Sequence, residues 1–92
     1  MINEIKSIIQ SELPDAKAVV YSPRQDDHHF EAIVISAEFE TLSLVKQHQR
    51  VMNALKTRFE TDLHALALKT FTPQQWDQNK DQFPADLITL LS

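Results

Sequence analysis

Residues 63–70, Leu-His-Ala-Leu-Ala-Leu-Lys-Thr, are the stretch that decides the fold of this chain. Alanine and leucine are good helix formers, but the run is short and a helix start follows it at once. That start is Thr72-Pro73-Gln74-Gln75, with threonine as the cap, proline at the first helical position and glutamine three residues after the cap. We therefore predict a strand with His64 at its head, followed by a short helix anchored by Trp76.

The segment before this strand predicts a second strand and a helical region. Phe30–Ser36 gives the clearest strand signal, because β-branched and apolar residues dominate it. From Thr41 to Phe59 the apolar residues follow helical spacing, over a length that fits two helices with a break near Lys46 and Gln47. Two strands joined by a helical crossover are expected to run parallel. The apolar positions expected near one helical face are Leu42, Val45, Met52, Leu55 and Phe59.

The first third of the chain predicts a helix and one more strand. Isoleucines at helical spacing follow Ile2, and Pro14 ends that helix. Ala16–Tyr21 is predicted to be a strand that pairs antiparallel with Phe30–Ser36 across a polar loop. The expected order α-β-β-α(α)-β-α gives an α/β (α+β) fold: a small mixed three-stranded sheet with helices mainly on one face. We expect a single domain over residues 1–80 and a C-terminal tail over 81–92, with one more helical turn after Pro84.

The composition excludes several classes of site. The 92 residues include no glycine, so dinucleotide-binding, P-loop, nucleophile-elbow and GxxG motifs are all absent. There is no cysteine, and the serines lie in no recognisable nucleophile turn. We therefore expect a protein that is not an enzyme.

The sequence also predicts the cellular location of the protein. The first residues alternate polar and apolar and include an acid, which does not fit a signal peptide. No apolar run approaches the roughly 20 residues of a membrane span. A cytoplasmic protein without membrane contact is the expectation.

Two histidines are expected to meet at one rim of the sheet. If the second and third strands run parallel, His29 before one strand and His64 at the head of the other lie at the same end. Asp26, Asp27 and His28 belong to the loop above them. Taken singly, a histidine at a strand end is more often a structural residue than a ligand. The spacings of a closed single-metal site, such as HExxH, are absent.

A small basic patch is the candidate for nucleic-acid binding. Lys46 and Arg50 are spaced to be neighbours on a helix, and a helix-turn-helix over Thr41–Phe59 would present them. The net charge is −4, so a solvated helix face is the simpler interpretation.

An ordered set of segments resembles the BolA-like family. The specific combination is His-Ala-Leu-Ala-Leu at 64–68 followed by Thr72-Pro73 and Trp76. Ser43–Lys46 and the Thr72-Pro73 and Trp76 details resemble the IbaG/YrbA branch more than BolA itself. The other segments that carry the resemblance are His29–Ser36, Phe39, Ser43–Lys46, Val45–Leu55 and Thr70–Trp76.

The resemblance implies an αββααβα fold of the class II KH type. It implies a non-enzymatic partner of monothiol glutaredoxins, with a [2Fe–2S] cluster and glutathione shared between the two proteins, in cluster trafficking and iron homeostasis. His64 corresponds to the family's main ligand, and the loop ligand corresponds to His29, with His28 as the alternative. The resemblance also implies a second possibility, a DNA-binding regulator of stress responses, and a homodimeric adaptor is a third.

The sequence departs from the family pattern at several positions. The basic triplet of BolA itself is Gln47-His48-Gln49 here, which weakens the DNA alternative. A glycine is replaced by Thr41 and a tyrosine by Met52, and none of these departures involves the proposed ligands. The chemistry of a shared cluster is consistent with the composition. Clusters are normally held by thiolates, which histidine can partly replace. A chain without cysteine supplies at most part of the ligand set, so no cofactor is expected on the isolated chain. Because imidazole binds metal only when neutral, the cluster is expected to be acid-labile and transferable.

Overall fold

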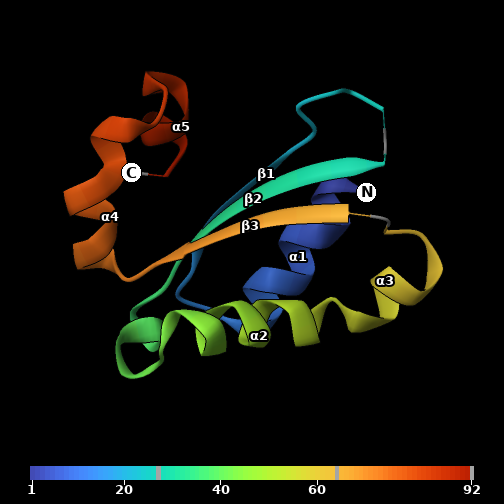
Figure 1. The fold of residues 1–92 in the computed structure, drawn as a ribbon, viewed down its shortest axis with the longest axis horizontal. Helices are drawn as coiled ribbons and strands as arrows, with labels where there is room; N and C mark the ends of the chain where they lie inside the picture. The colour runs from blue at the N-terminus through green and yellow to red at the C-terminus, as the bar shows by residue number, and fades with distance from the viewer. Residues whose placement is uncertain (27, 64, 92) are drawn as a thin grey trace.

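The computed structural model of the protein describes residues 1–26, 28–63 and 65–91. Its elements follow the predicted order, with two 3₁₀ helices in addition (Figure 1). They are α1 (Ile2–Glu12), β1 (Lys17–Tyr21), β2 (His29–Ile35), the 3₁₀ helix η1 (Ala37–Thr41), α2 (Leu44–Ala54), α3 (Lys56–Thr61), β3 (Ala65–Phe71), α4 (Pro73–Asn79), the 3₁₀ helix η2 (Lys80–Gln82) and α5 (Ala85–Leu90). None of the helices in these ranges is long and apolar enough to span a membrane.

The sheet has the predicted mixed topology, with β2 in the centre. β1 and β2 pair antiparallel, and Tyr21 opposite Glu31 is the pair nearest the loop that connects them. β2 and β3 run parallel, from His29 opposite Ala65 to Ile35 opposite Phe71. The predictions of a hairpin and of a parallel crossover are both confirmed, and β2 and β3 begin at the same rim of the sheet.

One face of the sheet carries the larger core, beneath α1, α2 and α3 (Figure 1). Alternate residues of each strand point to this face, because side chains in a strand alternate between its two sides. The buried residues of this core are Ile5, Ile9, Leu13, Ala16, Ala18, Val20, Phe30, Ala32, Val34, Phe39, Val51, Leu55, Leu63 and Leu68. The longer helices thus lie on one face, as expected.

The opposite face is covered in part by α4 and α5 (Figure 1). Its buried core consists of Ile33, Ile35, Trp76 and Leu91, with Phe83 packed against them. The later part of β2, from Ala32 to Ile35, is apolar on both faces, and this part of the second face therefore needs its own cover. The helical turn expected after Pro84 is present as α5, and the segment expected to be a tail packs onto the sheet through Leu91, which is 1% exposed.

The N-terminal start of α4 is formed as the sequence predicts. The Thr72 hydroxyl accepts from the Gln75 backbone N–H at 3.1 Å, and the Gln75 side chain accepts from the Thr72 N–H at 3.0 Å. Pro73 occupies the first turn. β3 ends at this capping box, and α4 begins there and packs on the second face of the sheet.

The helical crossover differs from the prediction in where it breaks. The break lies at Leu55, between α2 and α3, and not near Lys46 and Gln47. Val45, expected near the buried face, is 66% exposed, whereas Gln47 is 3% exposed. The expectation for Val45 is wrong because a polar residue takes the inward position.

Gln47 can be buried because its side chain is fully engaged. Its amide nitrogen donates to the carbonyl oxygens of Phe39, at 3.3 Å, and Leu42, at 3.1 Å. Its amide oxygen accepts from the Thr70 hydroxyl at 2.8 Å. These bonds connect η1 and β3 to α2, and a satisfied polar group can replace an apolar one in a core.

Candidate functional site

The starts of β2 and β3 form the candidate site. His29 is the first residue of β2, and its Cα partner in the parallel ladder is Ala65, the first residue of β3. The prediction that the two strands begin at one rim is therefore confirmed. His64 precedes Ala65 in the chain but lies outside the described residues, so its pairing with His29 stays a prediction.

The loop before β2 is organised around Asp26. One carboxylate oxygen, Oδ1, accepts from the backbone N–H groups of His28 and His29, both at 3.0 Å. The other, Oδ2, lies 2.8 Å from Nδ1 of the His29 ring. The Ser22 hydroxyl donates to the His29 carbonyl at 3.1 Å. His29 is thus held by its backbone and its ring together.

These bonds also set the charge of Asp26. The backbone N–H of His28, then the His29 side chain and the His29 N–H, hold the pKa of the Asp26 carboxyl well below its usual range. Hydrogen bonds to a carboxylate favour its charged form. Asp26 is therefore ionised at neutral pH. The sequence placed Asp26 in the loop without a role, and Asp27, its neighbour, lies outside the described residues.

An open hollow of about 460 Å³ lies beside His29. Ala65 and Ala67 contribute short side chains to its wall, and Arg24 contributes a cation. The remaining lining residues are Pro23, Phe30, Glu31 and Leu66. His29 keeps 47% of its side chain exposed, so its ring is accessible from this side. Among the described residues, no three histidine, aspartate or glutamate side chains converge as a complete metal-binding group.

The two basic residues of α2 that were predicted as a nucleic-acid-binding patch have different environments. Lys46 is exposed, whereas Arg50 is held by two carboxylates. Its Nε donates to Glu12 at 2.8 Å and its Nη2 to Glu38 at 3.1 Å. These bonds, that to Glu12 first, raise the pKa of the Arg50 guanidinium above its usual value. The Arg50 charge is therefore balanced within the protein, and His48 between the two is half-buried.

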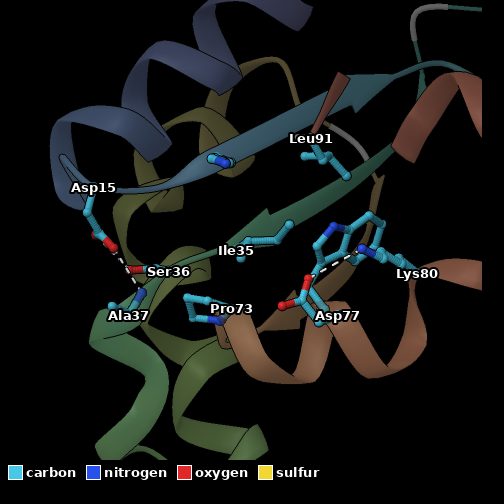
Figure 2. Close-up of a pocket in the computed structure, with 10 residues that line it drawn as sticks. Asp15, Ile35, Ser36, Ala37, Pro73, Asp77, Lys80 and Leu91 are labelled. Carbon is cyan, nitrogen blue, oxygen red and sulfur yellow. Dashed lines mark hydrogen bonds and ion pairs between the residues drawn. The ribbon is translucent and has the colours of Figure 1, made fainter. Parts of the chain in front are cut away.

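A second hollow of about 400 Å³ lies at the far end of β2, next to Ile35 (Figure 2). Figure 2 shows the Asp15 carboxylate turned toward Ser36 and Ala37, and it accepts from the Ser36 hydroxyl and the Ala37 N–H, both at 2.8 Å. Since His29 and Ile35 are the two ends of β2, this hollow is separate from the histidine rim.

Comparisons with known proteins agree on one family. A family model described as "BolA-like protein" matches residues 7–75, which include β2 and β3. The DNA-binding transcriptional regulator BolA of Haemophilus influenzae is 34% identical over 64 residues, which cover 70% of this chain and 62% of that protein. This chain therefore spans less than two thirds of that regulator's length.

Solved structures support the same relationship. A BolA protein homologue from Coxiella burnetii is 38% identical, with a TM-score of 0.66, and the match covers 84% of this chain and 96% of that one. BolA1 from Arabidopsis thaliana is 29% identical, with a TM-score of 0.73, and covers 80% of this chain and 93% of its own. The fold of most of this chain is thus shared with these structures.

Proposed function

This chain belongs to the BolA-like protein family, and we propose that it is a non-enzymatic partner of a monothiol glutaredoxin in handling a [2Fe–2S] cluster. The cluster is the cargo of the pair. The chain contributes imidazole ligands, and the glutaredoxin with glutathione contributes the thiolates.

The observation that carries this proposal is the parallel pairing of His29 with Ala65. It brings the start of β2 beside the residue that follows His64. We expect His64 at the same rim because it precedes Ala65 in the chain, and the imidazoles of His29 and His64 would then be the ligands on this side of the interface.

The metal-binding side chains of this protein can supply only part of the ligands of an iron–sulfur cluster. Iron–sulfur clusters take mainly thiolates, and histidine replaces some of them in known site types. This chain has no cysteine to offer. His29 offers an exposed ring, and His64 is the second ligand, with His28 as the alternative to His29. Both metal-binding rings must be neutral to donate a lone pair.

The hollow beside His29 carries charges of both signs, Arg24 and Glu31. Arg24 is the group that would pair with a carboxylate of glutathione or with a negatively charged, thiolate-ligated cluster. Because Ala65 and Ala67 leave this hollow open, a partner's ligands can approach the ring without moving the sheet.

A mixing experiment tests the proposal. The chain is added stoichiometrically to a monothiol glutaredoxin carrying a cluster assembled from iron, sulfide and glutathione. We expect the visible circular dichroism to change, because replacing a thiolate ligand with imidazole alters the electronic environment of the iron. A spectrum that stays that of the glutaredoxin alone contradicts the proposal.

The second candidate is a DNA-binding regulator, favoured by the name of the Haemophilus influenzae relative. Lys46 is exposed on α2, but Arg50 is ion-paired with Glu12 and Glu38. A gel-shift titration with candidate promoter DNA and random duplex distinguishes the candidates. We expect no preference over random duplex. A clear preference, with affinity that falls steeply as salt rises, supports the regulator instead.

A further inference from the structure

We propose that Asp26 is a positioning residue that holds the proton of neutral His29 on Nδ1, so that Nε2 is the ligand atom and His29 is the loop ligand. The ligand part of this inference rests on the proposed function. The tautomer part concerns the chain alone.

The direction of the ring hydrogen bond follows from the chemistry of its two atoms. Nδ1 of His29 and Oδ2 of Asp26 are 2.8 Å apart, and an ionised carboxylate can only accept. Nδ1 must therefore carry the proton. In a neutral imidazole the other nitrogen then bears the free lone pair. That lone pair is what a metal ion would need.

The carboxylate is itself fixed before it meets the ring. Its Oδ1 is occupied by the N–H groups of His28 and His29, so Oδ2 is the atom left to face the imidazole. The His29 backbone is fixed in turn by the ladder to Ala65 and by the Ser22 hydroxyl. The ring is anchored at both ends of the side chain, with 47% of its surface open.

Asp26 is the partner that orients the His29 ring. Asp26 contacts His28 through its backbone N–H and contacts His29 through both its backbone and its ring. Metal-binding histidines commonly donate their second ring N–H to a carboxylate, and losing that partner costs about 10–100-fold in metal affinity. The contact with Asp26 therefore gives His29 the oriented ring that a metal ligand needs.

The first measurement reads the tautomer in the isolated chain. Long-range ¹H–¹⁵N spectra are recorded at about pH 8, where an unperturbed imidazole is neutral. We expect His29 to be protonated at Nδ1. In Asp26→Asn, the amide oxygen can keep the backbone N–H bonds while the amide NH₂ faces the ring, so the proton moves to Nε2. Asp81→Asn, an exposed carboxylate in η2, is the matched control and leaves the His29 signals unchanged.

The second measurement reads ligand choice in the complex with cluster-loaded glutaredoxin. We expect Asp26→Asn to weaken cluster-dependent association about 10–100-fold. His29→Ala loses the change in visible circular dichroism, and His28→Ala keeps it. Asp26→Glu, which restores a carboxylate acceptor, recovers part of the affinity.

The outcomes separate this inference from the proposed function. An Nε2-protonated His29 in the unaltered chain overturns the positioning role, whatever the cluster does. Loss in His28→Ala together with retention in His29→Ala overturns the choice of ligand. An Nδ1-protonated His29 in a chain that forms no shared cluster supports the positioning role and overturns the ligand role together with the proposed function.

Discussion

Replacing His64 with alanine is expected to abolish the change in visible circular dichroism that the unaltered chain causes on cluster-loaded glutaredoxin. Alanine has no donor atom, and a chain without cysteine has no thiolate that could take the vacant position. With only one of the two proposed imidazole ligands left, the cluster is expected to stay with the thiolates of the glutaredoxin. The His64→Ala mixture should therefore give the spectrum of the glutaredoxin alone.

The control for this variant is His48→Ala, which removes a half-buried imidazole from the middle of α2. It should leave the spectral change intact. Far-UV circular dichroism of both variants checks that the fold persists. If folded His64→Ala changes the cluster spectrum as much as the unaltered chain does, the assignment of this histidine as a ligand is contradicted.

Replacing Trp76 with alanine is expected to destabilise the protein by about 3–5 kcal/mol, the usual cost of removing a buried large aromatic side chain. Trp76 is 5% exposed, and its ring centroid lies 5.5 Å from that of Phe71 and 5.2 Å from that of Phe83. It joins β3 to the C-terminal segment, so its loss uncovers Ile33 and Ile35 on the second face. A small domain has a total stability of only about 5–15 kcal/mol, so the effect is large.

Urea unfolding followed by far-UV circular dichroism measures this loss, since the variant lacks the tryptophan fluorophore. Gln78→Ala, an exposed residue on α4, is the matched control and should change stability by less than about 0.5 kcal/mol. A loss below about 1 kcal/mol in Trp76→Ala would mean that the second face does not depend on this side chain.

The fold was predictable where local signals agree with each other. The capping box at Thr72 fixes the end of β3 through bonds within four residues of chain, so the sequence contains all of it. The parallel pairing of β2 and β3 followed from a general rule on helical crossovers. The family resemblance agreed with both.

The helical crossover was less predictable because burial there depends on partners far away in the sequence. Apolar spacing favoured Val45 as an inward residue, yet Val45 is exposed and Gln47 is buried. Gln47 is stabilised in the core by the Thr70 hydroxyl, 23 residues later in the chain. Periodicity measures hydrophobicity along a helix and contains no information on such a bond.

The sequence by itself determined the order of the elements, the shared rim of the two strands and the absence of a thiolate ligand. These follow from local propensity, chain connectivity and composition. Only the tertiary structure decided that Arg50 is ion-paired with Glu12 and Glu38, that the C-terminal segment covers a second core, and that Asp26 holds the His29 ring. Each of these depends on the distance and orientation of side chains, which the folded backbone fixes and residue order alone does not.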